Sequence, residues 1–481
     1  MKKIGLIGGI LSFAAMRLLS APSTMSDASW AVCALTVLMA IWWLTEAMPL
    51  AATALAPVVL VPMLGVQTLE AVVPAYAHPL VFLFLGGFLI AKALERWELH
   101  SRMAATVLRL SPQSPAGLIG AVMATTAFLS MWISNTATAM LMIPIVQSIA
   151  QTKAQFGDAD YKDTQTNNPF LAALILAVAF SATVGGMASL IGTPPNALLA
   201  GYLQTSHGLS IGFGHWMLLG VPMATALLAI TWLVLTRFAL TGGVDRFATT
   251  DYSLIHSYHY RKPLSTAARL TALITATTGA GLMLRPLLQS VMPTIVLNDA
   301  AIVMTGALIL FAMPAFSNDD NRLLGWEQAR SIRWDVLILF GGGLALAAAI
   351  EASGLAQFIG HAFTPSDALP VAVLIIVAMV VVVFLGELAS NTAMAAIFLP
   401  IAGAAASSLG IAPIELILPI GLAASLGFML PVATPPNAIA FGTGLVSSQQ
   451  MMRVGAMLDV VTIPVVYVFA VTIGSWIVSP I

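Results

Sequence analysis

Residues 134–145 read SNTATAMLMIPI and residues 390–401 read SNTAMAAIFLPI, so one block occurs twice in the chain, 256 positions apart. Seven of the twelve positions are identical. Two further segments recur in the same order: Phe84-Leu85-Gly86-Gly87 as Phe340-Gly341-Gly342-Gly343, and Thr193-Pro194-Pro195-Asn196-Ala197 as Thr434-Pro435-Pro436-Asn437-Ala438. We therefore predict a chain built from two related halves.

The composition places these halves in a membrane. Hydrophobic residues make up 59% of the 481 positions and charged residues only 8%, against about 25% charged residues in a soluble domain. The net charge of -1 gives no attraction to nucleic acid. Cys33 is the only cysteine, which excludes an intramolecular disulfide and a cysteine-based metal cluster. The expected fold class is an all-α polytopic membrane protein.

Apolar runs give the expected membrane spans, since a helix needs roughly 20 apolar residues to cross about 30 Å of hydrocarbon. Candidate spans are 4–20, 30–45, 50–65, 80–96, 170–203, 214–238, 265–284, 299–314, 334–352, 411–442 and 456–477. Two further apolar stretches, 115–150 and 369–406, carry the Ser-Asn-Thr motifs near their middle.

The distribution of basic residues predicts the orientation. If both motif-bearing stretches are re-entrant hairpins and the N-terminus is cytoplasmic, the segments 92–109, 151–165, 237–269, 317–333 and 444–455 face the cytoplasm. Together with Lys2 and Lys3, these segments hold every Lys and Arg except Arg17 and Arg285. We therefore predict eleven spans, two hairpins, an external C-terminus and an inverted repeat, as in secondary transporters. Because no Asn-X-Ser/Thr acceptor occurs, we expect a bacterial inner-membrane protein.

The Ser-Asn-Thr motifs place hydroxyls and amides at membrane depth, where they are costly unless satisfied. Hydrogen bonding between helices is the simpler role for one such motif. A duplicated block in an inverted repeat favours a binding site. Two hairpin tips would present side chains and free N–H groups to one anion, because helix N-termini carry partial positive charge.

The repeated Thr-Pro-Pro-Asn blocks lie inside long apolar runs, and two successive prolines break a helix. A structural kink is the alternative role for either block alone. Carbonyls freed at such a break are good ligands for a hard monovalent cation. No Lys or Arg lies beside either motif, so the charge of an anion must be met by dipoles and bound cations. Glu387, close to Ser390, is expected to support its hairpin or to tune a cation site.

Other functional classes fit less well. No Gly-X-X-X-X-Gly-Lys-Ser/Thr segment indicates an ATP-driven pump, and no His-Glu-X-X-His segment indicates an intramembrane protease, so we predict that the chain is not an enzyme. An ion channel with a polar filter remains an alternative. Inverted repeats with broken helices favour a carrier.

The paired motifs, the two Thr-Pro-Pro-Asn blocks and the segment 43–50 (WLTEAMPL) resemble the divalent anion/sodium symporter family over nearly the whole chain. The resemblance implies a homodimer in the membrane lipid that carries succinate, other C4 dicarboxylates, citrate or sulfate with Na⁺. It also implies an elevator mechanism, in which a transport domain slides against a scaffold. The scaffold would comprise residues 1–114 and 265–367, and the transport domain residues 115–240 and 368–481. A cytoplasmic linker, 241–264, would join the halves.

The resemblance also implies site residues. The substrate carboxylates would meet Ser134, Asn135, Thr136, Ser390, Asn391, Thr392, Thr193 and Thr434. One sodium site would comprise Ser130, Ser134, Asn135 and Gly192. The other would comprise Gly386, Ala389, Asn391 and Ala433. Members of that family often have Thr where this chain has Gly386, so a sodium-independent exchanger or a citrate carrier remains an alternative to a sodium-coupled succinate symporter.

Overall fold

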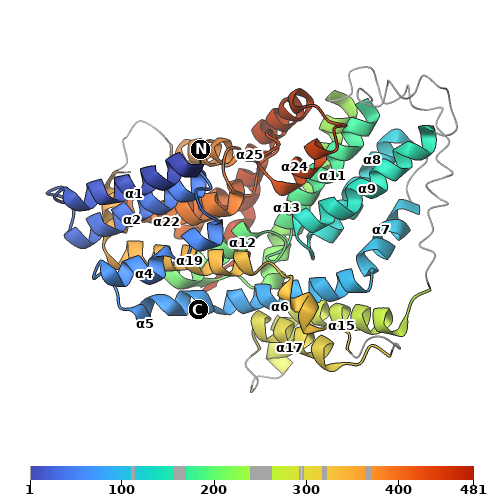
Figure 1. The fold of residues 1–481 in the computed structure, drawn as a ribbon, viewed down its shortest axis with the longest axis horizontal. Helices are drawn as coiled ribbons and strands as arrows, with labels where there is room; N and C mark the ends of the chain where they lie inside the picture. Colours follow the sequence, from blue (N-terminus) through green and yellow to red (C-terminus); the bar gives the residue numbers. More distant parts are fainter. Residues whose placement is uncertain are drawn as a thin grey trace.

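A computed structural model describes residues 2–109, 114–154, 169–238, 263–291, 294, 297–316, 322–362 and 370–480. Apart from its last two residues, the expected linker 241–264 lies outside these ranges. Helices dominate the described chain (Figure 1).

The first half begins with four elements that match the expected spans closely. These are α1 (Lys2–Leu18), α2 (Asp27–Leu44), the pair α3 (Leu50–Thr53) and α4 (Ala56–Met63), and α6 (Pro79–Arg96), with α5 (Leu69–Val72) and η1 (Val73–Ala77) before α6. The remainder consists of α7 (Leu99–Arg109), α8 (Pro115–Ser130), α9 (Asn135–Ala154), α11 (Pro169–Met187), α12 (Pro194–His207), β1 (Leu209–Ser210), α13 (Phe213–Leu233) and the π-helical turn η3 (Val234–Phe238).

The elements of the second half begin at Thr266 with the helices of its predicted scaffold part, and its own motif-bearing helix pair and helix break follow. Its elements are α15 (Thr266–Met283), α16 (Arg285–Val291), α17 (Asp299–Ala312), α18 (Trp326–Arg330), α19 (Trp334–Ala352), α20 (Leu355–Ala362), α21 (Val371–Gly386), α22 (Asn391–Leu409), α23 (Pro413–Ala423), α24 (Pro435–Gly442), α25 (Ser448–Ile477) and β2 (Ser479–Pro480).

Both motif-bearing stretches form helix pairs that break at the motif. The pair α8 and α9 is interrupted at 131–134, and the pair α21 and α22 at 387–390, so corresponding helix ends lie at the offset of the sequence repeat. α8 and α9 lie side by side (Figure 1). The leading helices α8 and α21 have 16 residues each, about 24 Å of helix, which is short of the hydrocarbon thickness. This geometry supports re-entrant hairpins.

The two predicted helix breaks are confirmed. α11 ends at Met187 and α12 begins at Pro194, while α23 ends at Ala423 and α24 begins at Pro435. Each Pro-Pro pair occupies the first turn of the second helix, where a missing N–H costs nothing. Thr193 and Thr434 are the extended N-cap residues of these two helices.

In the described ranges, seven helices are long and apolar enough to cross a membrane, or eight if the bent pair α15 and α16 counts as one span. The other expected spans correspond to shorter or interrupted helices, so the count of eleven stays a prediction. One boundary was wrong: α25 begins at Ser448 rather than near 456. Its start is set by a capping box, in which Ser447 Oγ accepts from Gln450 N and Gln450 Oε1 accepts from Ser447 N.

A two-stranded antiparallel pair ties the end of the chain to the first half. Leu209 of β1 pairs with Pro480 of β2, and Ser210 pairs with Ser479. The loop after α12 and the C-terminus therefore lie on the same face of the molecule. The predicted topology requires this, because it places both outside.

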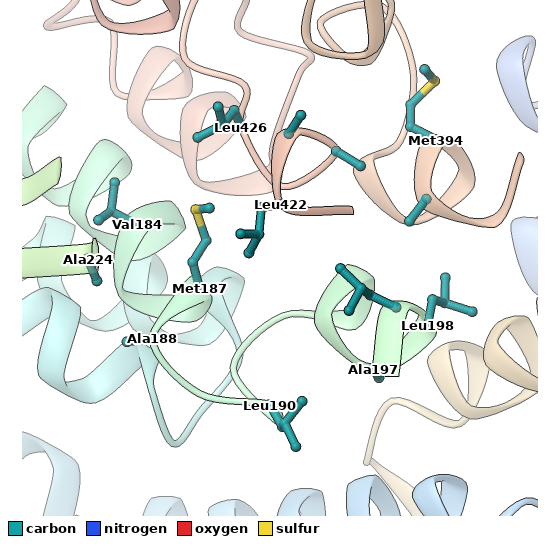
Figure 2. Packing of buried hydrophobic residues seen from close by; sticks show 14 of the residues in the cluster. Val184, Met187, Ala188, Leu190, Ala197, Leu198, Ala224, Met394, Leu422 and Leu426 are labelled. Atoms are coloured by element: carbon teal, nitrogen blue, oxygen red, sulfur yellow. The ribbon is translucent and has the colours of Figure 1, made fainter. Parts of the chain in front are cut away.

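The two breaks share one apolar core. Figure 2 shows Met187, the last residue of α11, close to Leu422, near the end of α23, and both belong to the buried hydrophobic cluster. The rings of Phe180 and Phe428, both fully buried, meet edge to face with centroids 5.5 Å apart. α24 also packs against α9 and α11. This packing holds the halves of the expected transport domain together.

Candidate functional site

The Asn135 side chain gathers oxygen atoms from three segments of the first half. Its Oδ1 accepts from Ser130 Oγ at 2.7 Å. The same position of the amide lies 3.1 Å from the carbonyl oxygen of Ala182 and 3.2 Å from that of Gly192. Ser130 ends α8, Asn135 starts α9, and Gly192 lies in the break after α11. The hairpin tip and the helix break therefore meet at one point.

This oxygen cluster has the chemistry of a monovalent cation site. An amide oxygen that faces other oxygens is unfavourable by itself. Either the Asn135 amide turns so that Nδ2 donates to all three, or a cation lies between the oxygens. The four oxygens are uncharged, and the Gly192 carbonyl comes from the unwound backbone between α11 and α12. Such oxygens suit Na⁺ in broken membrane helices.

Two glycines permit the approach of the hairpin to the break. A Cβ on Gly186 would overlap Asn135 Oδ1 and come within 2.9 Å of its Nδ2. A Cβ on Gly192 would overlap the carbonyl oxygen of Gly186 and come within 2.9 Å of its Cα. Close packing at the cluster therefore depends on the absence of side chains at these positions.

The second half repeats the arrangement with one group missing. Asn391 Nδ2 donates to the carbonyl oxygen of Ser425 at 3.2 Å, and within the described residues no donor reaches the buried Asn391 Oδ1. The corresponding oxygen of the first half is bonded by Ser130. Gly386, which stands 256 positions after Ser130, has no hydroxyl to offer. The missing side chain at Gly386 thus explains the unpartnered oxygen.

Asn196 and Asn437, from the two Thr-Pro-Pro-Asn blocks, stabilise the two helix breaks by side-chain hydrogen bonds to backbone carbonyls. Asn196 Nδ2 donates to the carbonyls of Ser189 at 2.8 Å and Gly186 at 3.2 Å. Asn437 Nδ2 donates to those of Leu430 at 3.1 Å and Gly427 at 3.4 Å, at the same spacings in sequence. Both amides are fully buried, so they satisfy carbonyls that the break leaves without helical partners.

Each hairpin tip is also bonded to its break, by different groups. In the first half, Ser189 Oγ donates to the carbonyl of Met131 at 2.6 Å. In the second half, Glu387 accepts from Met429 N at 2.9 Å and from Leu430 N at 2.6 Å. The expectation that Glu387 supports its hairpin agrees with these bonds.

The six Ser-Asn-Thr residues are half-buried, whereas the surrounding helices are largely buried. Each motif stands at the N-terminus of a long helix, α9 or α22. Ser134 and Thr136 line a cavity of about 400 Å³. Its other walls include Lys92 and Arg333. The cavity therefore reaches the N-terminus of α9, where helix N–H groups favour an anion.

The structure brings part of each predicted set together. Ser130, Asn135 and Gly192 converge, whereas Ser134 lies in the cavity and its Oγ accepts from Ala137 N at 3.3 Å. In the second half, Asn391 Oδ1, Ala433 and Thr434 all lie around Gly427. Thr193 and Thr434 are each 5% exposed. A single cavity that contains both motifs stays a prediction.

The sequence analysis missed Ala182, Gly186 and the roles of Asn196 and Asn437. Ala182 contributes a backbone carbonyl, for which no residue type gives a signal. Gly186 and its counterpart Gly427 could have been found by extending the repeated Thr-Pro-Pro-Asn block toward the N-terminus. Residues 186–197 read GMASLIGTPPNA, and residues 427–438 read GFMLPVATPPNA. Both segments start with Gly, and the Asn that bonds the break stands ten positions later.

Comparisons with known proteins show the family of the chain. The family model for the sodium:sulfate symporter transmembrane region matches residues 2–479. A sodium-dependent dicarboxylate transporter, SdcS, from Staphylococcus saprophyticus is 37% identical over 471 residues, which is 96% of this chain and 89% of that protein. The SdcS of Staphylococcus aureus is 37% identical over 491 residues, which is 99% of this chain and 93% of that protein.

A solved structure supports the fold. The crystal structure of the YdaH transporter of Alcanivorax borkumensis superposes with a TM-score of 0.56 at 16% sequence identity and covers 92% of this chain and 98% of its own. At this identity the likeness concerns the fold alone, which is that of an all-helical polytopic membrane protein.

Proposed function

Because the chain belongs to the family of the sodium:sulfate symporter transmembrane region, we propose that it takes up C4 dicarboxylates such as succinate together with Na⁺. The oxygen cluster around Asn135 carries this proposal, since it joins a hairpin tip to a broken helix through uncharged cation ligands. The curated relatives described above are named as sodium-dependent dicarboxylate transporters over nearly the whole length.

In this proposal the substrate is held by dipoles and by Na⁺ rather than by a salt bridge. Ser134, Asn135 and Thr136 at the start of α9, with Ser390, Asn391 and Thr392 at the start of α22, bind the carboxylates. Thr193 and Thr434 stand beside them at the N-termini beyond the two breaks. A bound cation offsets the cost of placing a dianion at membrane depth.

The two sodium sites flank the substrate. Ser130, Asn135, Gly192 and the carbonyl of Ala182 form the first, and Ser134 adjoins it. Gly386, Ala389, Asn391 and Ala433 form the second, which has fewer side-chain ligands. We propose that the homodimer moves substrate and Na⁺ by an elevator motion of residues 115–240 and 368–481 against a scaffold of residues 1–114 and 265–367. We also propose that the cavity lined by Ser134, Lys92 and Arg333 opens toward the cytoplasm, because both basic residues lie in segments that the charge distribution assigns to the cytoplasm.

The direct test is uptake of labelled succinate into proteoliposomes that contain the purified chain. We expect uptake only with an inward sodium gradient, and inhibition by unlabelled malate or fumarate. Equal uptake into succinate-loaded vesicles without sodium would instead establish an exchanger. Competition by citrate without competition by succinate would shift the substrate class.

A substitution at Gly386 tests the second sodium site. A Cβ there would meet no atom closer than Met394 Cγ at 3.8 Å, so Gly386→Ser fits and offers a hydroxyl to Asn391 Oδ1. One added hydrogen bond is worth about 1 kcal/mol, so we expect the half-saturating sodium concentration for uptake to fall about fivefold. Gly386→Ala adds the Cβ without the hydroxyl and is the control. An equal change in both variants would show that filled space, not the hydroxyl, is responsible.

A further inference from the structure

We propose that Lys92 and Arg333 form a second, low-affinity dicarboxylate subsite on the cytoplasmic side, which receives the substrate as it leaves the hairpin tip. The inference rests on the proposed function and adds to it a binding site on the scaffold. This site would act on one face of the membrane only.

The cavity of about 400 Å³ joins the two sites. One wall comes from the first hairpin and includes Ser134 and Thr136, and the opposite wall comes from α6 and the segment before α19 and includes Lys92 and Arg333. An anion that leaves Ser134 enters this space. The cavity thus provides a continuous path from the proposed central site to two basic side chains.

Both basic side chains keep donors for an anion. Lys92 Nζ donates to Glu95 Oε2 at 2.6 Å and has further N–H groups. Arg333 uses Nε and Nη2 on Asp335, which leaves the other N–H groups of its guanidinium. The side chains are 29% and 48% exposed. The Lys92–Glu95 pair is a single contact that solvent screens, whereas Arg333 holds Asp335 through two of its nitrogens. An incoming carboxylate therefore binds chiefly to the N–H groups that these two pairs leave unused.

The backbone adds a second source of positive potential. Arg333 is the N-cap residue of α19, a helix of 19 residues, and has no side-chain cap bond. The helix dipole favours an anion next to Arg333, while Asp335 in the same turn offsets it. The first-turn N–H groups of Trp334 and Val336 already donate to the carbonyls of Ile332 and Arg333. A dicarboxylate reaching this point meets a helix end and a guanidinium together.

His100 lines the same cavity but adds no charge at neutral pH. Burial lowers the pKa of His100 below its ordinary value, so its imidazole is neutral there. Glu95 is the acidic group on this wall. The balance of charge in the cavity is therefore set chiefly by Lys92 and Arg333 against Glu95 and Asp335.

The subsite would ease the release of the substrate from the central site to the cytoplasm. The central site holds its anion with dipoles and Na⁺, and the sequence has no Lys or Arg beside either Ser-Asn-Thr motif. When Na⁺ leaves, the dianion loses its counter-charge before it reaches bulk water. The N–H groups that Lys92 and Arg333 do not use in their ion pairs offer charge-assisted hydrogen bonds to that dianion.

The test compares the two faces of the membrane. Uptake of labelled succinate by intact cells reports the outer face, and uptake by inside-out membrane vesicles reports the cytoplasmic face. For Lys92→Gln and Arg333→Gln we expect the KM on the cytoplasmic face to rise about threefold to fivefold and the KM on the outer face to stay unchanged. Arg330→Gln is the matched control, because Arg330 pairs with Glu327 close by and does not line the cavity.

A variant with the opposite expected effect on the KM completes the test. Glu95→Gln removes the competitor of Lys92 and is expected to lower the KM on the cytoplasmic face. Equal shifts on both faces, or no shift in Lys92→Gln and Arg333→Gln, would overturn the subsite. These outcomes are distinct from failure of the proposed function, which would appear as a lack of sodium-driven uptake by the unaltered chain. Membrane protein levels, measured by immunoblot, normalise every rate.

Discussion

Gly186→Ala is expected to reduce sodium-driven succinate uptake about 100-fold or more, whereas Gly427→Ala is expected to retain it. A Cβ on Gly186 overlaps the Asn135 amide, so the amide must move away from Ser130 Oγ and from the carbonyls of Ala182 and Gly192. Loss of several contacts in a buried polar cluster costs about 3 kcal/mol or more, which corresponds to this factor. The measurement is the initial rate of uptake at saturating sodium.

Gly427 is the matched control because it has the same place in the other half. Each glycine stands ten positions before the Asn that fastens its break. A Cβ on Gly427 would lie 3.5 Å from Thr434 Cγ2 and 3.6 Å from Asn391 Oδ1, which is ordinary contact. Alanine also favours the helix α11 that contains Gly186, so a folding defect is not the expected cause of the loss. Comparable uptake by the two variants would disprove the close approach at Asn135.

The difference between these glycines shows where sequence reasoning stops. The helix pairs at the two motifs and the helix breaks at the Pro-Pro pairs were predicted well, because apolar runs, Pro-Pro pairs and a repeat at fixed offset leave clear marks in a sequence. α19 matches its predicted span, and both breaks fall at the Thr-Pro-Pro-Asn blocks. These features depend on local chemistry and on the thickness of the membrane.

The site depends on contacts that leave no such mark. Ala182 contributes only its carbonyl oxygen, and any residue could do so. Glu387 bonds to the N–H groups of Met429 and Leu430, about forty residues away, where the first half uses Ser189 and a carbonyl. Because the two halves solve the same problem with different groups, comparing the repeats cannot reveal either solution.

The charges illustrate a different limit. Lys92 and Arg333 contributed to the predicted orientation as members of basic segments, and nothing in that argument distinguished them from Arg330. Only the fold shows that two of the three line the cavity with Ser134. Position along the chain gives the side of the membrane, while the packing of α6 and α19 around the hairpin determines which charges meet a substrate.

Asn135→Ala and Asn391→Ala are each expected to abolish uptake while the protein still folds and inserts into the membrane. Asn135 holds three oxygens from α8, α11 and the first break, and Asn391 joins the second hairpin tip to the end of α23 through Ser425. Removal of either amide takes away a cation ligand and a bond between hairpin and break. Uptake rates, with thermal unfolding of the purified variants, separate loss of function from loss of structure.

Asn298→Ala is the control for deleting an amide elsewhere. Asn298 caps α17, where its Oδ1 accepts from Ala301 N at 2.7 Å, so its loss should cost about 1 kcal/mol of stability without changing the sodium dependence of uptake. Near-normal uptake by Asn135→Ala or Asn391→Ala would mean that the motif packs helices together. Adding Gly386→Ser to the Asn391 variant should restore nothing, because the new hydroxyl would have no amide oxygen to bind.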